Sequence, residues 1–125
     1  MTAQPSLMWF RQDLRLRDNP ALSAAVNSGP VLPVYILDDT NSAPWQIGAA
    51  SRWWLHQSLS ALNAQLTDRL MILRGDPSKL IPALAADYGI KKIFWNRCYE
   101  PWRSKRDSEL KQALKNSGLT VTSSN

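Results

Sequence analysis

The chain has 125 residues, of which 44% are hydrophobic and 20% charged, and its formal net charge is +5. This size and composition are typical of one globular domain with its own core. No run approaches the roughly 20 apolar residues of a membrane helix, and the first ten residues lack the pattern of a signal peptide. Cys98 is the single cysteine, so no intrachain disulfide can form. We therefore expect a cytoplasmic protein without a membrane span.

Short apolar segments alternate with helical patterns along the chain. The middle segments are almost continuously apolar, as strands covered on both faces are. Pro33 lies inside one of them, and because proline has no N–H, we expect it at a strand start or in an edge strand. The predicted strands are 6–10, 31–37, 69–74, 92–95 and 119–123.

Helices are predicted in the four gaps between these strands. Three of them begin with a capping residue followed by proline, namely Asn19-Pro20, Asp76-Pro77 and Glu100-Pro101. Proline in the first turn loses no hydrogen bond, and the preceding side chain can accept one from a free backbone N–H. Glycines lie where helices should end, at positions 29, 89 and 118.

The remaining helix is predicted over about residues 48–66. Its leucines recur on one stripe, with Trp54 at the flank of the stripe and Trp53 on the opposite side. We therefore expect Trp53 to be exposed or to cover a crevice. The leucines are 55, 59, 62 and 66.

The alternation of strand and helix predicts an α/β domain with a five-stranded parallel sheet and helices on both faces, one half of a doubly wound fold. Ligands of such folds bind beyond the carboxyl ends of the strands. The charged stretch after the first strand, residues 11–19, should lie at this edge. Because the chain closes on a strand, we expect it to be a domain of a longer protein.

Several kinds of site are excluded by the sequence. There is no GxGxxG after the first strand and no GxxxxGK[ST], so the common dinucleotide and triphosphate sites are absent. His56 is the single histidine and Cys98 the single cysteine, which argues against a metal cluster and against a Cys–His nucleophile pair. We expect His56 to pack or to lie on the surface. Asp38-Asp39 is typical of a turn.

Residues 91–115 hold eight Lys and Arg residues against three Asp and Glu residues. This basic segment is either a solvated helix face or a surface that attracts nucleic acid. Within it, Arg103 and Arg106 fall on the same predicted helix stripe as Leu110 and Ala113. Inward-pointing arginines near a helix start need an anion, which is either a ligand or one of the carboxylates Asp13, Asp38 and Glu100.

Three separated motifs resemble the DNA photolyase/cryptochrome family: "WFRQDLRLRDNPAL", "GAASRWWLHQSLSALN" and "WNRCYEPWRSKRD". The segment "RGDPSKLIPALA" between the last two is similar as well, so the resemblance covers essentially the whole chain. The chain looks more like a bacterial cyclobutane pyrimidine dimer photolyase than like a signalling cryptochrome.

The resemblance implies an N-terminal α/β domain with strand order 3-2-1-4-5, followed in the parent protein by a larger helical domain. In the family, the helical domain binds FAD, holds the electron-transfer tryptophans and takes the flipped-out lesion of damaged DNA. Reduced, excited FAD then splits the dimer. The α/β domain can hold a second, light-harvesting pigment. This fragment is therefore expected to be inactive alone, and to have the helical domain as its partner.

The antenna pigment of the family is a deazaflavin, a folate or another flavin. Folate-binding members have an Asn-Glu pair where this chain has Trp102-Arg103. Deazaflavin-binding members have an acidic residue where this chain has Cys98. By resemblance, the positions that agree with a deazaflavin site are Ile36, Leu37, Asp38, Arg52 and Arg106.

The resemblance also implies a contact between the two domains. In the family the loop after the first strand lies near the helical domain, so its charged residues either fix the domains in register or pair with each other on the surface. Trp53 is a further candidate for this contact. The charged candidates are Arg11, Asp13, Arg15 and Asp18.

Three other functions stay open. The first is a cryptochrome-type photoreceptor domain. The second is a stand-alone α/β nucleotide-binding module, which should carry a glycine-rich loop after the fourth strand, where this chain has "NRCYEPW". The third is a nucleic-acid-binding module that uses the basic segment.

Overall fold

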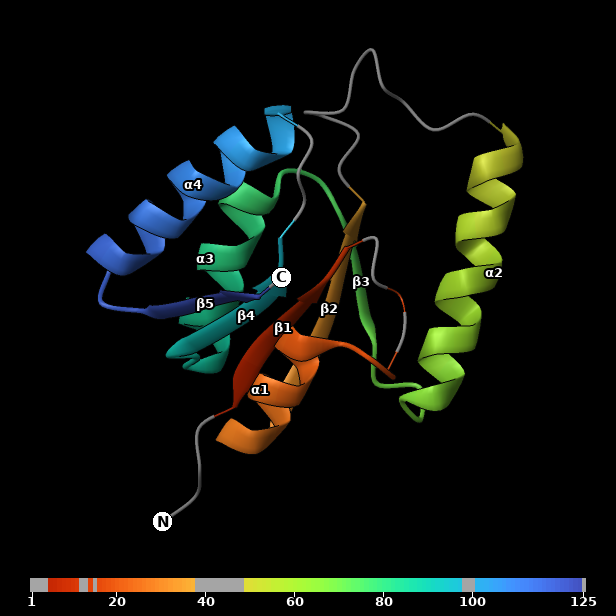
Figure 1. The fold of residues 1–125 in the computed structure, drawn as a ribbon, viewed down its shortest axis with the longest axis horizontal. Coiled ribbons are helices and arrows are strands. Elements are labelled where there is room, and N and C mark those ends of the chain that lie inside the picture. Colours follow the sequence, from red (N-terminus) through yellow and green to blue (C-terminus); the bar gives the residue numbers. More distant parts are fainter. Residues whose placement is uncertain (1–4, 12–13, 15, 38–48, 98–100, 125) are drawn as a thin grey trace.

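The computed structural model describes residues 5–11, 14, 16–37, 49–97 and 101–124, and for residues 49–52 and 101–104 the backbone alone. It contains a five-stranded sheet in the order β3-β2-β1-β4-β5, in which all the pairs are parallel (Figure 1). This arrangement confirms the predicted fold class and strand order. The strands are β1 (Ser6–Phe10), β2 (Val31–Leu37), β3 (Met71–Arg74), β4 (Lys92–Asn96) and β5 (Thr120–Ser124).

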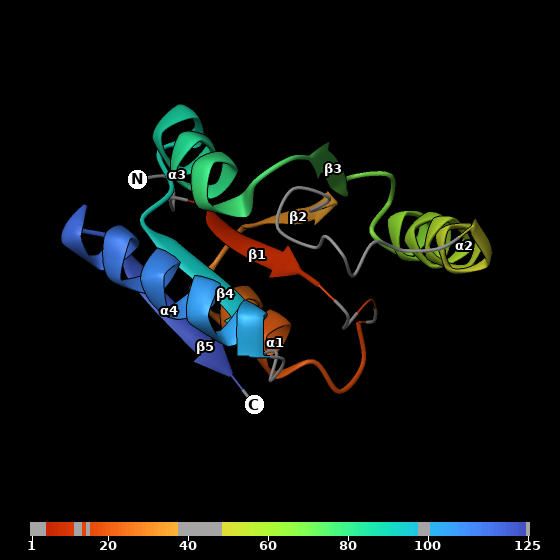
Figure 2. The ribbon, with the colours of Figure 1, turned by 90° about the horizontal axis from the view of Figure 1, so that it is seen from above.

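Four helices connect the strands: α1 (Pro20–Ser28), α2 (Ala49–Gln65), α3 (Pro77–Tyr88) and α4 (Pro101–Asn116). α2 lies beside the β3 end of the sheet and α4 beside the β5 end (Figures 1 and 2). Alternate residues of the central strand β1 enter two separate cores. Leu7 and Trp9 pack with α3 and α4, whereas Met8 and Phe10 pack with α1 and α2.

Two of the predicted helix starts are confirmed in atomic detail. The side chain of Asn19 accepts a hydrogen bond from the N–H of Leu22 at 3.1 Å, and that of Asp76 accepts one from the N–H of Ser78 at 3.0 Å. Each is followed by proline in the first turn. The third capping residue, Glu100, lies outside the described residues. α3 ends at Gly89, whose left-handed φ of 65° favours glycine.

Pro33 does not lie in an edge strand, because β2 is an internal strand between β1 and β3. It is the third residue of β2 and stands opposite Met8 of β1. β3 begins to pair with β2 only at Val34. The amino-terminal part of β2 therefore has a neighbour on one side only, and proline is tolerated there although the strand as a whole is internal.

The leucine stripe of α2 is confirmed. Leu62 is buried, and Leu55, Leu59 and Leu66 are partly buried against the same core. Trp53 and Trp54 are 65% and 68% exposed, which confirms the predicted exposure of Trp53. Within the described residues, no helix is long and apolar enough to cross a membrane.

Candidate functional site at the switch point of the sheet

The strand order reverses between β1 and β4. The chain passes from β1 outward to β2 and β3, then crosses back to place β4 on the other side of β1. In a parallel sheet this reversal separates the loops on the carboxyl side and leaves a crevice where ligands bind. Arg11 directly follows β1, and Asn96 ends β4, so these two residues lie at the switch point.

A buried ion pair lies at the switch point of the sheet. The Nη1 atom of Arg11 lies 2.6 Å from Oδ2 of Asp107 on α4, and the two side chains are only 5% and 11% exposed. The same Nη1 atom donates to the backbone oxygen of Asn96 at 3.3 Å. Arg11 thus joins the ends of β1 and β4 to α4, and its charge is neutralised inside the domain.

Two tryptophans form the floor beneath this ion pair. Trp9 and Trp95 are buried, and their rings meet edge to face with centroids 5.3 Å apart. The guanidinium of Arg11 lies 4.5 Å from the ring centroid of Trp9, and that of Arg106 lies 5.5 Å from it. At these distances both cations interact with the negative face of the indole.

A second polar network fixes the start of α1 against β4. Asn96 Nδ2 donates to Asn19 Oδ1 at 2.6 Å, and Asn96 Oδ1 accepts from the N–H of Ala21 at 3.1 Å. Asn19 is 2% exposed, so its amide is satisfied by the protein rather than by bulk water. These bonds hold the carboxyl edge rigid around the switch point.

Arg106 lies at the flank of the core-facing stripe of α4 rather than on it. The buried positions are Asp107, Leu110 and Leu114, whereas Ala113 is exposed. The predicted stripe was therefore about one residue out of phase, because it counted Ala113 as apolar and Asp107 as polar. The Arg106 side chain is still only 12% exposed, and its Nη2 atom donates to Oδ1 of Asp107 at 3.5 Å.

The carboxylate beside Arg106 is thus Asp107, which was not among the partners expected from the sequence. The three predicted carboxylates, Asp13, Asp38 and Glu100, lie outside the described residues. So does the side chain of Arg103. Asp107 was missed because a carboxylate on a helix is ordinarily exposed, and its partner Arg11 is 96 residues away.

The other predicted pigment-site residues lie on both faces of the sheet. Ile36 is buried in the core shared with α3 and α4, the face on which Arg106 meets Trp9. Leu37 is half-buried against the core of α1 and α2. Asp38 and the side chain of Arg52 lie outside the described residues. The structure thus brings Ile36 and Arg106 to one face of the sheet and places Leu37 on the other.

The predicted domain-contact residues differ in exposure. Arg11 is 8% exposed and bonded within the domain, whereas Trp53 and Asp18 are exposed. Asp13 and Arg15 lie outside the described residues. The contact with a second domain stays a prediction. His56 is exposed on α2, and the described residues contain no group of three or more potential metal ligands.

Together, the parallel sheet and its strand order define a doubly wound α/β domain. The DNA photolyase family model matches residues 6–125, and the chain therefore belongs to the DNA photolyase family. It is 45% identical over 123 residues to a deoxyribodipyrimidine photo-lyase of Agrobacterium fabrum, a match that covers 95% of this chain and 25% of that protein. It is 37% identical over 131 residues to Cryptochrome-1 of Sinapis alba, covering 99% of this chain and 26% of that protein.

Solved structures agree with this assignment. A class III photolyase from Agrobacterium tumefaciens superposes with a TM-score of 0.89 and 41% identity, over 99% of this chain and 26% of that one. An archaeal photolyase from Sulfolobus tokodaii, described with two FAD molecules and the implication of a novel light-harvesting cofactor, gives a TM-score of 0.83 and 25% identity, over 98% and 29% of the two chains. The chain spans about a quarter of the length of these relatives.

Proposed function

We propose that this chain is the light-harvesting, pigment-binding domain of a DNA photolyase. The parent protein would use reduced FAD, held by a C-terminal helical domain, and blue or near-ultraviolet light to split cyclobutane pyrimidine dimers in DNA. The 125-residue chain would be inactive alone. The observation that carries the proposal is the position of Arg106: a largely buried guanidinium at the ligand edge of the sheet, stacked over Trp9.

Arg106 is suited to a pigment with a polar or anionic ring edge. Asp107 and the face of Trp9 orient the guanidinium, which has five N–H donors to share between the protein and a ligand. Ile36 lines the same face of the sheet with apolar surface. By resemblance, Leu37, Asp38 and Arg52 belong to the proposed site as well, although the side chain of Leu37 packs on the other face of the sheet. The pigment, when bound, would absorb light, and the domain's part is to hold it in a fixed orientation.

The identities to the relatives favour a photolyase over a cryptochrome. The identity to the Agrobacterium photo-lyase is 45%, against 37% for the Sinapis cryptochrome. A cryptochrome-type photoreceptor is the second candidate, and dimer repair by the parent separates the two. The Sulfolobus structure, with its two FAD molecules, supports a flavin as one candidate pigment beside a deazaflavin and a folate.

The proposal is tested by Arg106→Ala in the full-length parent. Losing a charge-assisted hydrogen bond should weaken pigment binding by about 1.5–3 kcal/mol, or about ten- to a hundredfold. The ratio of released pigment to protein should fall, whereas dimer repair driven by direct excitation of FAD should continue. Arg69→Ala, at an exposed arginine just before β3, is the matched control.

Two results would contradict the proposal. The first is an unchanged pigment ratio together with a lowered melting temperature, which would make Arg106 purely structural. The second is light-dependent loss of dimers with the 125-residue chain alone, which would show that no helical domain is needed.

A further inference from the structure

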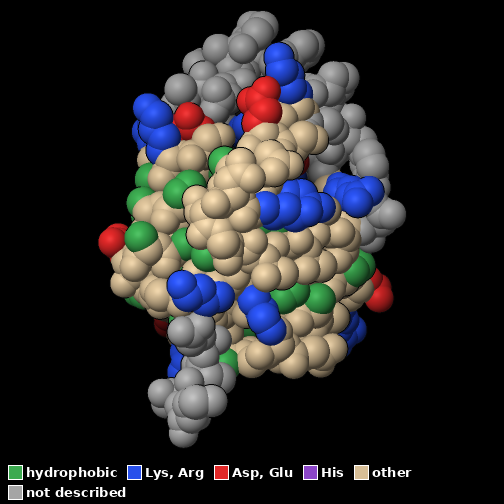
Figure 3. Space-filling model, turned by 90° about the vertical axis from the view of Figure 1, so that its left-hand side faces the viewer, with side chains coloured by type: hydrophobic (Ala, Val, Ile, Leu, Met, Phe, Trp, Pro, Cys, Tyr) green, Lys and Arg blue, Asp and Glu red, His purple; other side chains and the backbone are tan. Residues whose placement is uncertain are grey.

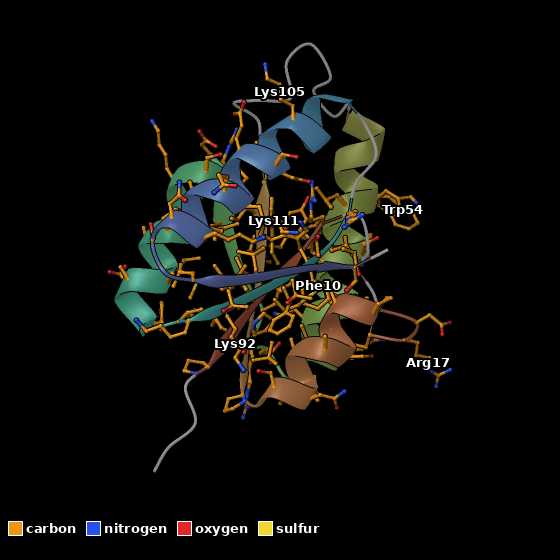
Figure 4. The ribbon with its side chains drawn as sticks, turned by 60° about the vertical axis from the view of Figure 1, so that its left-hand side comes forward. Phe10, Arg17, Trp54, Lys92, Lys105 and Lys111 are labelled. Atoms are coloured by element: carbon orange, nitrogen blue, oxygen red, sulfur yellow. The ribbon has the colours of Figure 1, made fainter. Side chains whose placement is uncertain are left out.

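Two cations from different elements converge on one hydroxyl at the β5 side of the sheet. Arg97, directly after β4, donates from Nε to Ser123 Oγ at 3.3 Å, and Lys111 of α4 donates from Nζ to the same oxygen at 3.1 Å. Figure 4 shows Lys111 between α4 and β5. We refer to Arg97, Lys111 and Ser123 as the Arg97–Lys111 cluster. A lysine ammonium has three N–H donors and an arginine guanidinium five, so each cation has further donors beyond this shared bond.

The surroundings of this cluster are positive. On β4, β5 and α4, the described carboxylates are Asp107 and Glu109, and Asp107 is buried against Arg11. β5 itself carries hydroxyl side chains and no charge. Lys and Arg side chains outnumber Asp and Glu side chains on this side of the molecule (Figure 3). The described cations of these elements are Lys92, Arg97, Lys105, Arg106, Lys111 and Lys115.

The pKa of Lys111 agrees with this excess of positive charge. Burial, followed by the like charges of Lys115 and Arg97, lowers the pKa of Lys111 below its ordinary value of 10.5. A lysine that a carboxylate neutralised would have its pKa raised instead. Lys111 therefore lies among like charges.

The chemistry of the surface indicates what kind of anion fits. The large exposed hydrophobic residues lie on other elements, and within the described residues none is on β4, β5 or α4. Protein-binding surfaces rely on aromatic and apolar anchors, and single-stranded nucleic acids are bound by aromatic stacking. Contacts to the backbone of DNA come from Arg, Lys and hydroxyl side chains. We propose that the Arg97–Lys111 cluster binds a backbone phosphate of duplex DNA, a contact independent of the pigment site.

The experiment measures binding of the 125-residue chain to a short duplex of arbitrary sequence across a range of salt concentrations. The double variant Arg97→Gln/Lys111→Gln should flatten the plot of log K against log salt by about 0.9, because the two cations share one phosphate and each lost phosphate contact removes about 0.9 from the slope. Between about 50 and about 200 mM salt, the variant should therefore lose about three- to fourfold less affinity than the wild type. Arg69→Gln/Lys79→Gln removes the same charge from exposed positions elsewhere, and should keep the wild-type slope.

The melting temperature controls for folding. The lowered pKa of Lys111 means that folding disfavours its charged form, so removing the charge should not destabilise the fold. The proposal is overturned if the chain does not bind duplex DNA at low salt, or if the two double variants flatten the slope equally. It is also overturned if polyglutamate binds as tightly as DNA and loses affinity in the same variant, since the partner is then an acidic protein segment.

Discussion

The residues that matter most at the switch point are charged ones that the domain has buried. Arg11 and Asp107 lose hydration on folding, and the ion pair at 2.6 Å, together with the Asn96 carbonyl and the Trp9 ring, offsets that loss. Such a pair adds little net stability over an apolar pair. Removing one partner is costly, because the other charge stays buried without it.

Asp107→Asn should therefore lower the free energy of unfolding by about 3–5 kcal/mol. Denaturant titration of the 125-residue chain measures this loss. Glu109→Gln, on the exposed side of the same helix, should change the free energy by less than about 0.5 kcal/mol. The double variant Arg11→Met/Asp107→Asn should lose less than the two single variants combined, since neither Arg11 nor Asp107 is then left as a buried charge without its partner. Equal losses for Asp107→Asn and Glu109→Gln would show that the ion pair is hydrated.

At the scale of elements, two helices begin with the same sequence signal in different surroundings. Asn19 and Asp76 each precede a proline and each accept a hydrogen bond from the first turn. Asn19 is buried and also accepts from the side chain of Asn96, whereas the bond at Asp76 is exposed to solvent. The shared signal fixes where both helices start, and burial decides how much each cap contributes.

Asp76→Ala should cost about 1 kcal/mol of unfolding free energy, the ordinary cost of a lost cap. Asn19→Ala should cost about 1–3 kcal/mol more, because it also takes the Asn19 acceptor away from the partly buried amide of Asn96. Thermal melts of the two variants, run side by side, give the difference. If the two losses match, the bond between Asn19 and Asn96 contributes nothing to stability.

These elements also show what the sequence can and cannot predict. The strand bounds of β1 and β2 agree with the predicted 6–10 and 31–37, because continuous apolar runs between turn residues are a local signal. Pro33 was expected at a strand start or in an edge strand, and the structure places it near the start of β2, where only β1 pairs. That β2 as a whole is internal is a property of pairing, which no single segment contains. The ion pair of Arg11 with Asp107 escaped prediction for the same reason: it forms only when α4 crosses the end of β1.

At the scale of the whole molecule, the described tryptophans fall into two groups. Trp9 and Trp95 are buried in the core beneath the switch point, whereas Trp53 and Trp54 are exposed side by side on α2. Figure 4 shows the Trp54 side chain pointing away from the sheet. Two neighbouring exposed indoles are unusual on an isolated domain and typical of a surface that a partner covers. This distribution supports the proposed contact with a helical domain at Trp53.

Trp53→Ser should leave the stability of the 125-residue chain within about 0.5 kcal/mol, because the side chain makes few contacts there. Trp95→Ala, by contrast, should cost about 3–5 kcal/mol through the cavity that it leaves in the core. In the full-length parent, a docked helical domain should protect Trp53 from hydroxyl-radical oxidation, measured by mass spectrometry against the 125-residue chain. Tyr88, which is 49% exposed on α3 at the opposite face of the sheet, is the internal reference and should react equally in both. Equal oxidation of Trp53 in the two proteins would place the helical domain elsewhere and leave the exposed tryptophans of α2 to a different partner.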